Sequence, residues 1–251
     1  MEYGEFEAKF LEIKARGFVP SDKPFHKGNA GAVGNTLETQ LGIRENNVKG
    51  PDYMGWELKS QRSRSGSPLT LTSIKPTFPA KAGNYIRQKW GQPDKKFPNV
   101  HTFRSSLFAN RDSVTYGTHT MRLFLNRDEK RLVISRKGLD GSSVDESVYW
   151  SFDDLRLGLR KLNNLIYVEA EEKIIDGVVH FRFVSCDAFI SFEFESFLNE
   201  LSRGGVQYDN RLGVYGSGSK IGTPHDHGGA FRLRKPLETL SSLYQNSHHL
   251  Y

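Results

Sequence analysis

The pattern of hydrophobic and polar positions changes several times between helical and extended periodicity along the chain. Phe6, Phe10 and Ile13 recur at helical spacing within residues 5–16, which predicts a helix that stops at Gly17. A second helix is predicted to hold Leu37 and Leu41, with Asn35 or Thr36 as its cap. Further helices are predicted over 81–90, 153–162, 192–201 and 237–243.

Extended segments alternate with these helices. They are rich in β-branched and aromatic residues and are bounded by turn residues. The predicted strands are 56–61, 69–74, 121–125, 132–135, 148–152, 165–170, 178–184, 206–215 and 230–233. Asp176-Gly177 is a favoured tight-turn pair, and the last five residues, 247–251, are expected to be frayed. The mixture predicts an α/β fold with a mixed sheet. The absence of repeats and of a low-complexity linker favours one unit with two lobes.

Composition narrows the class of protein. The chain has 251 residues, 37% of them hydrophobic and 25% charged, which is typical of a soluble globular protein. No apolar run approaches the roughly 20 residues that span a bilayer, and the acidic N-terminus does not resemble a signal peptide. Cys186 is the only cysteine, which excludes a disulfide framework and a cysteine zinc site. We therefore expect the protein to act in the cytoplasm.

The net charge is compatible with a polyanionic partner, although many basic proteins bind none. The formal net charge is +6, from 35 Lys and Arg against 29 Asp and Glu. Basic residues crowd the segment 59–96, whereas acidic residues collect at 169–172 and 193–200. The excess is modest, so the placement of the charges is more informative than their sum.

The segment 51–59, PDYMGWELK, holds the strongest candidate chemistry. Glu57 and Lys59 are two residues apart on a predicted strand, so both leave the same face, while Trp56 and Leu58 point into a core. Asp52 lies just before the strand and can fold back towards that face. Two carboxylates suit Mg²⁺, and an ammonium group suits an anionic substrate. The alternative is a solvated strand with an ordinary ion pair.

The loop 216–229 contains His225-Asp226-His227, which permits several interpretations. A zinc site lacks further ligands at suitable spacing, and a catalytic triad lacks a nucleophile elbow. Hydrogen bonding to base edges, with Arg232 nearby, suits these side chains, and so does a plain polar surface turn. Asp209 and Arg211 share one face of the preceding strand, as an ordinary ion pair also would.

Several motifs together resemble a known family. They are Gly34 to Glu38, Pro51-Asp52, Glu57-Leu58-Lys59, Leu69 to Leu71, Ser147 to Asp153, Arg211 to Tyr215 and His225 to Gly228. In this order, from about Phe10 to Leu240, the chain is similar to the MvaI/BcnI-type restriction endonucleases. These are relatives of the mismatch-repair nicking endonuclease MutH within the PD-(D/E)xK nuclease superfamily.

The resemblance implies a restriction-endonuclease-like, MutH-like core with two lobes around a DNA-binding cleft. A catalytic lobe would contain residues 30–90, and a DNA-recognition lobe would contain residues 205–235. Asp52 and Glu57 would hold Mg²⁺, Lys59 would serve the attacking water or the scissile phosphate, and Glu38 would complete the catalytic group. The expected DNA-binding residues are Asp209, Arg211, His225, Asp226, His227 and Arg232.

The resemblance also implies the activity. We expect a type II enzyme that hydrolyses double-stranded DNA at a CCNGG-like site, one strand at a time, as a monomer. A cognate DNA methyltransferase is expected in the same system. The loop with His227 favours CC(A/T)GG over CC(C/G)GG. Two other hypotheses are a MutH-like nickase that needs a partner and a catalytically silent DNA-binding module.

Overall fold

Segments interleaved along the chain form two units in the computed structural model. The structure describes residues 4–22, 31–43, 50–141, 143–226 and 229–251. Unit 1 comprises Met1–Ser67, Arg160–Glu193 and Leu240–Tyr251, and unit 2 comprises Pro68–Leu159 and Phe194–Thr239. The expected catalytic lobe, residues 30–90, is therefore divided, because residues 68–90 belong to unit 2. The expected recognition lobe, residues 205–235, lies within unit 2.

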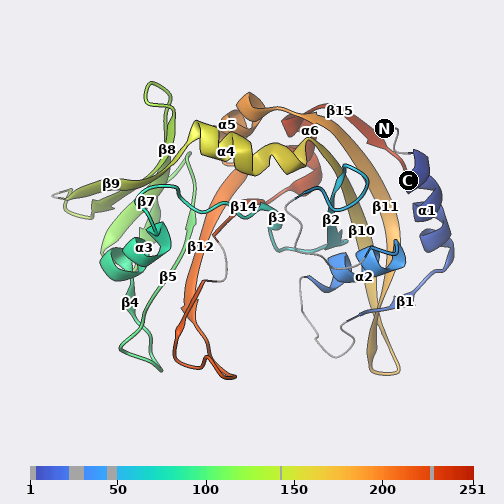
Figure 1. Ribbon diagram of the computed structural model, residues 1–251, viewed down its shortest axis with the longest axis horizontal. Helices are drawn as coiled ribbons and strands as arrows, with labels where there is room; N and C mark the ends of the chain where they lie inside the picture. The colour runs from blue at the N-terminus through green and yellow to red at the C-terminus, as the bar shows by residue number, and fades with distance from the viewer. Residues whose placement is uncertain (1–3, 23–30, 44–49, 142, 227–228) are drawn as a thin grey trace. The chain divides into compact units, whose positions relative to one another are not determined.

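Unit 1 is built on one mixed sheet. Its helical and extended elements are α1 (Gly4–Ala15), β1 (Val19–Pro20), α2 (Ala32–Gln40), β2 (Glu57–Arg62), the 3-10 helix η1 (Arg160–Leu162), β10 (Asn164–Ile175), β11 (Val178–Phe192) and β15 (Tyr244–His249). The strand order is β1-β11-β10-β2, with β15 also paired to β11. β2 runs parallel to β10, and the other pairs are antiparallel. In Figure 1, β10 and β11 form the long hairpin, and its turn carries the predicted Asp176-Gly177 pair at positive φ.

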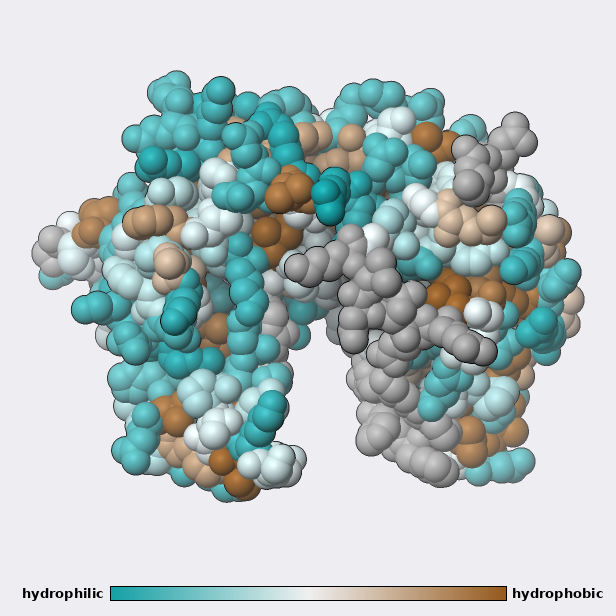
Figure 2. All heavy atoms as spheres, in the orientation of Figure 1, coloured by the Kyte–Doolittle hydropathy of each residue, from teal (hydrophilic) through white to brown (hydrophobic). Residues whose placement is uncertain are grey.

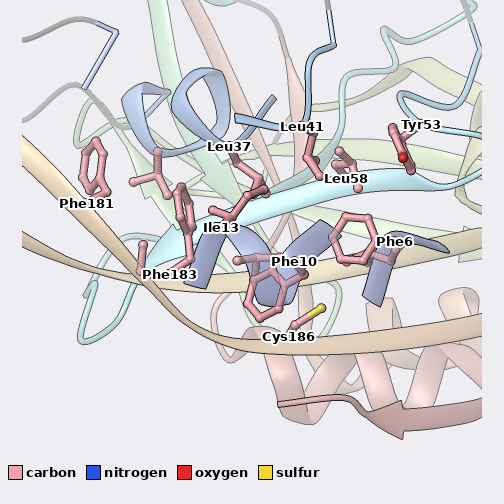
Figure 3. Packing of buried hydrophobic residues seen from close by; sticks show 14 of the residues in the cluster. Phe6, Phe10, Ile13, Leu37, Leu41, Tyr53, Leu58, Phe181, Phe183 and Cys186 are labelled. Carbon is pink, nitrogen blue, oxygen red and sulfur yellow. The ribbon is translucent and has the colours of Figure 1, made fainter. Parts of the chain in front are cut away.

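A hydrophobic core joins the two helices of unit 1 to the sheet (Figure 3). α1 contributes Phe6, Phe10 and Ile13, as its periodicity predicts, and α2 contributes Leu37 to the same cluster as Leu58 of β2. This packing fixes α2 against the strand that begins with Glu57. α2 starts earlier than expected: its N-cap is Gly31, not Asn35 or Thr36, and Thr36 is buried inside the helix.

The C-terminal segment corrects a sequence prediction. We expected residues 247–251 to be frayed, but β15 pairs with β11, and Leu250 and Tyr251 pack against the core of unit 1. The Cys186 N–H donates to the Tyr251 carbonyl at 2.7 Å, and the Leu250 N–H donates to the Cys186 carbonyl at 2.9 Å. The side chains of β15 are mostly polar and point outward, so its sequence has no alternating hydrophobic pattern, although its backbone pairs with β11.

Unit 2 contains two antiparallel sheets. Its elements are β3 (Leu69–Thr72), α3 (Ala82–Trp90), β4 (Gln92–Pro93), β5 (His101–Leu107), β6 (Ser113–Thr115), β7 (His119–Asn126), β8 (Arg131–Gly138), β9 (Val144–Ser151), α4 (Phe152–Leu159), α5 (Phe194–Arg203), β12 (Val206–Val214), β13 (Pro224–Asp226) and β14 (Ala230–Leu233). One sheet has the order β3-β14-β12-β5-β4, with β13 added beside β12, and the other has the order β6-β7-β8-β9. α6 (Pro236–Leu243) crosses the boundary between the units.

The central strand of unit 2, β12, has one apolar face and one polar face. Tyr208 on the apolar face contacts Trp150 and Phe231, with ring centroids 4.6 and 5.0 Å apart. Phe197 of α5 joins the cluster at 5.3 Å from Phe231. The face of the molecule drawn in Figure 2 is mainly hydrophilic, in keeping with cores that lie inside each unit. The polar side of β12, with Gln207, Asp209 and Arg211, faces away from this aromatic cluster.

Most predicted elements are confirmed, with shifted ends. β10 and β11 extend beyond the expected 165–170 and 178–184, and α4 ends at Leu159 before the 3-10 turn. β5 lies in the stretch 92–117, where no element was predicted, and β13 lies in the loop 216–229. α3 ends at Gly91 as expected.

Candidate active site and recognition face

A tight turn returns Asp52 to the start of β2. Met54 and Gly55 both have positive φ, and Tyr53 and Trp56 exchange backbone hydrogen bonds of 2.9 and 2.7 Å across them. Two consecutive positive φ values are typical of the hairpin turn whose twist matches paired strands. The chain therefore reverses at Met54-Gly55, and the Leu58 N–H donates to Asp52 Oδ2 at 3.0 Å.

Glu57 is the most deeply buried carboxylate of this segment. Its residue is 0% exposed, whereas the sequence also allowed a solvated strand. Lys59 Nζ donates to Glu57 Oε1, as their shared face requires. The other oxygen, Glu57 Oε2, is buried and has no hydrogen-bond partner among the described residues. Burying a carboxylate oxygen without a hydrogen-bond partner costs folding free energy, so this atom is a candidate position for a ligand.

Lys161 is a residue of this site that the sequence patterns did not reveal. Its Nζ also donates to Glu57 Oε1, at 2.6 Å, from η1 just before β10. The parallel pairing of β2 with β10 begins at Glu57 opposite Leu165, which places the entry to β10 beside the motif. Lys161 and Glu57 are 104 positions apart, so no sequence spacing could have linked them. Once the pairing of β2 with β10 is known, the position of Lys161 just before β10 places it beside the motif.

A buried tyrosine anchors the turn that carries Lys161. Tyr244 at the start of β15 donates its hydroxyl to the Leu162 carbonyl at 2.7 Å. Burial, with a smaller contribution from the charge of Glu57, raises the pKa of Tyr244 well above its ordinary value. The neutral hydroxyl is thus a permanent donor that holds η1 next to Glu57.

Glu38 lies on α2, the helix that packs on β2, and its side chain is partly exposed. The described residues contain no group of three or more His, Cys, Asp or Glu side chains arranged to hold a metal ion. Glu38, Asp52 and Glu57 are therefore not assembled as a three-carboxylate cluster in this geometry. The residues that fit a hard cation are Asp52, which is exposed, and Glu57 through Oε2.

Unit 2 carries a second group of candidate residues, which we call the recognition face: Ser106, Gln207, Asp209, Arg211 and Arg232. Alternation puts Gln207, Asp209 and Arg211 on one side of β12, and the strand register places Ser106 opposite Asp209 and Arg232 opposite Gln207. Directly opposed residues of antiparallel strands project to the same side. The five side chains therefore form one surface from three strands.

Asp209 is the centre of the recognition face and is only 4% exposed. Its Oδ1 accepts from Ser106 Oγ and Gln207 Nε2, each at 2.8 Å. Its Oδ2 accepts from Arg211 Nη2 at 3.1 Å and is 3.0 Å from Arg232 Nε, in an ion pair too bent to count as a hydrogen bond. Both oxygens are thus engaged by the protein, in contrast to Glu57.

Arg232 is partly buried beside a second arginine. Desolvation lowers its pKa, nearby Arg211 lowers it further, and Asp209 opposes both. Arginine stays protonated at neutral pH regardless. The Asp209 carboxylate therefore orients the guanidinium groups of Arg211 and Arg232. Oriented donors of this kind suit a ligand whose acceptor atoms have fixed positions.

The hairpin that carries His225 and Asp226 is tied to the same sheet. β13 pairs with β12, Tyr215 stacks on His225 with ring centroids 4.0 Å apart, and Lys75 Nζ forms an ion pair with Asp226 at 2.6 Å. Arg87 of α3, a buried residue, donates to the carbonyls of His101 at 2.7 Å, Gly213 at 2.8 Å and His225 at 3.2 Å. His227 lies outside the described residues.

Comparison with known proteins decides the family. The model of the MvaI/BcnI restriction endonuclease family matches residues 7–244. The chain belongs to the MvaI/BcnI restriction endonuclease family. It is a type II site-specific deoxyribonuclease, in agreement with the resemblance of its motifs.

Two solved structures of this family are similar over the whole chain. The restriction endonuclease MvaI in complex with cognate DNA matches at 26% identity and a TM-score of 0.89, covering 100% of this chain and 99% of that one. MvaI without DNA matches at 25% identity and a TM-score of 0.62, covering 100% and 98%. Among curated proteins there is no match. None of the described helices is long and apolar enough to cross a membrane.

Membership of the MvaI/BcnI family confirms the expected mixed α/β nuclease fold. The family is generally dependent on divalent metal ions. In this member, Glu57 contacts Lys59 and Lys161 in unit 1, and Asp52 accepts from the Leu58 N–H of the same strand. Asp209, Arg211 and Arg232 meet in unit 2.

Proposed function

We propose that this endonuclease cleaves double-stranded DNA at a CCNGG-like site, CC(A/T)GG, with Mg²⁺ as cofactor. It acts in the cytoplasm as a monomer on one strand at a time, alongside a DNA methyltransferase of the same specificity. The observation that carries the proposal is the state of Glu57, a buried carboxylate with two lysines on one oxygen and no protein partner on the other.

Asp52 and Glu57 are the residues that would hold the cation. Carboxylate oxygens are the ligands that Mg²⁺ prefers, and Glu57 Oε2 is the buried oxygen that a cation would satisfy. A divalent cation bound there supplies charge neutralisation at the phosphate and lowers the pKa of an attacking water. Glu38 on α2 is proposed to assist from the helix packed on β2.

The two lysines provide a positive environment for the scissile phosphate. In the structure both ammonium groups contact Glu57 Oε1, so one carboxylate charge is paired with two lysines. A phosphate oxygen of the bound DNA would compete with Glu57 for the Lys59 and Lys161 ammonium groups, so their contact with Glu57 would weaken. Lys59, the less exposed of the two side chains, stabilises the charge that develops on the phosphate, and Lys161 supports it.

Base recognition is assigned to unit 2. Arginine pairs with guanine O6 and N7, and carboxylate accepts from cytosine N4, so Arg211, Arg232 and the His225-Asp226-His227 loop suit a G·C-flanked site. Because both oxygens of Asp209 are engaged by protein donors, we assign it to directing the two arginines. The complex of MvaI with cognate DNA supports DNA as the partner.

The test is digestion of a plasmid that carries CCAGG and CCCGG sites, with Mg²⁺ and with EDTA. Mg²⁺-dependent fragments that form through a nicked intermediate are expected, with ends at CCAGG. Lys59→Ala should keep DNA binding and lose cleavage. Tight binding without cleavage by the wild type would instead identify a silent module or a nickase that needs a partner.

A further inference from the structure

Arg104 belongs to the surface that the recognition face forms. It lies on β5 directly opposite Arg211, two residues before Ser106, which is opposite Asp209. The register is regular across these pairs, so Arg104 projects to the same side as Arg211. Arg104, Ser106, Asp209 and Arg211 line a hollow of about 560 Å³ within unit 2.

Arg104 has no ion pair with any of the residues that the structure describes. The ion pairs of Arg211 and Arg232 both go to Asp209, whereas in the part of the chain that the structure describes the Arg104 guanidinium pairs with no carboxylate. Like charges directly opposed on neighbouring strands are unfavourable. Arg104 and Arg211 oppose each other directly, and Asp209 forms its ion pair with Arg211, so the two arginines are a local electrostatic conflict in the free protein.

Asp209 has no capacity left to resolve this conflict. Ser106 and Gln207 donate to Oδ1, Arg211 donates to Oδ2, and Arg232 forms an ion pair with Oδ2, so both oxygens already have protein partners. Arg104 thus lines the same hollow as Asp209 and Arg211, and the carboxylate is already paired with Arg211 and Arg232. An anion entering the hollow removes the repulsion, and phosphate is the anion whose geometry matches the arginine fork.

We propose that Arg104 binds a backbone phosphate of DNA, as a positioning contact rather than as a reader of bases; this inference rests on the function proposed above. Arg211 and Arg232 are held in fixed directions by Asp209, as a base edge with a fixed acceptor pattern requires. Arg104 is exposed, and no side chain among the described residues fixes its direction, so it follows the phosphate that lies nearest. Phosphate contacts fix the orientation of a protein on the duplex without selecting its sequence.

The experiment measures equilibrium binding of Arg104→Gln to a CCAGG duplex and to a scrambled duplex in EDTA, over a series of salt concentrations. Both affinities should fall by the same factor, and the slope of log K against log salt should decrease by about 1. Arg104→Lys keeps the charge and should retain the slope. Arg127→Gln is the matched control, since Arg127 is an exposed arginine of the same unit that is paired with Glu195.

Two results would overturn the inference. A loss confined to the CCAGG duplex would make Arg104 a base reader, and wild-type binding by Arg104→Gln would make it a solvated side chain. The wild-type protein in the same series reports on the proposed function itself. If it fails to prefer the CCAGG duplex while Arg104→Gln still lowers both affinities and the slope, the proposed specificity fails and the phosphate contact stands. If the wild type binds neither duplex, both fail.

Discussion

In each unit a buried carboxylate is contacted by two cationic side chains, but the two carboxylates differ in how many of their oxygens have protein partners. Glu57 in unit 1 accepts from Lys59 and Lys161 through a single oxygen, and its second oxygen has no partner among the described residues. Asp209 in unit 2 uses both oxygens, one for neutral donors and one for two arginines.

We propose that this difference separates a catalytic carboxylate from one that orients arginine side chains. Burial next to cations is common to both carboxylates, so burial alone does not indicate catalysis. The unsatisfied oxygen of Glu57 is a place where a ligand improves the free energy of the folded protein. The saturated Asp209 gains nothing from a direct ligand, and its effect is to orient the arginines that lie at the surface. Variants that alter each carboxylate's partners should therefore change different properties.

Among the next four variants, the largest effect is expected for Lys161→Met. This variant removes one of the two ammonium groups at Glu57 and should slow cleavage on the order of 10²–10³-fold, because a preorganised charge near the phosphate is lost. DNA binding in EDTA should stay close to wild type. Single-turnover cleavage measures the change, and Lys173→Met, on an exposed lysine of the same unit, is the control. Cleavage at the wild-type rate would remove Lys161 from the site.

Asp209→Asn should change specificity instead of rate. The amide oxygen still accepts from Ser106 and Gln207, but the amide nitrogen faces Arg211 and Arg232 and no longer fixes them. Discrimination between CCAGG and altered sites should fall by roughly 10- to 100-fold, as expected for about 1–3 kcal/mol per base contact. Competitive cleavage of paired substrates measures it.

A melting curve accompanies this variant, because it leaves the partly buried Arg232 and the exposed Arg211 without their counter-ion. If the protein unfolds, Arg211→Lys provides the same comparison, since it keeps the ion pair and removes the two-pronged donor. Unchanged discrimination in a folded Asp209→Asn protein would contradict the assigned role.

A smaller loss is expected for Ser106→Ala. The hydroxyl contributes one of the two hydrogen bonds to Asp209 Oδ1, and a hydrogen bond to a charged group is worth about 1.5–3 kcal/mol at most when no water replaces it. Because Ser106 is exposed and water can substitute, discrimination should fall only about fivefold. Ser106→Thr restores the hydroxyl and should restore discrimination, which a purely steric effect would not do.

The smallest effect is expected for Glu171→Gln. Glu171 and Arg182 form an ion pair on β10 and β11, and both side chains are nearly half exposed. Exposed pairs of this kind contribute about 1 kcal/mol or less to stability. Chemical denaturation should show a change within that range and cleavage should be unaffected, so a large loss of activity would show that carboxylates outside the two sites also matter.

The sequence was informative where the site is local. Asp52, Glu57 and Lys59 lie within eight residues, so turn and strand geometry alone bring them together. Core positions such as Phe6, Phe10 and Leu58 follow from periodicity in the same way. The strand pair Asp209 and Arg211 was also visible, although its burial was not.

Residues brought in by strand pairing could not be predicted. Lys161 reaches Glu57 from 104 residues away, and Ser106 meets Asp209 from 103 residues away, through registers that no periodicity contains. β5 was missed because its alternation includes Arg104 and two serines, and the terminal strand β15 was missed because its outward side chains are polar. His227, which favoured CC(A/T)GG, stays a prediction.

The most direct test compares Glu57→Gln with Asp209→Asn in two assays, Mg²⁺-dependent cleavage and duplex discrimination in EDTA. Glu57→Gln should bind the CCAGG duplex with wild-type preference and fail to cleave it, whereas Asp209→Asn should cleave but lose that preference. Cleavage by Glu57→Gln at a rate near that of the wild type would contradict the claim that the unsatisfied carboxylate of unit 1 is the catalytic one.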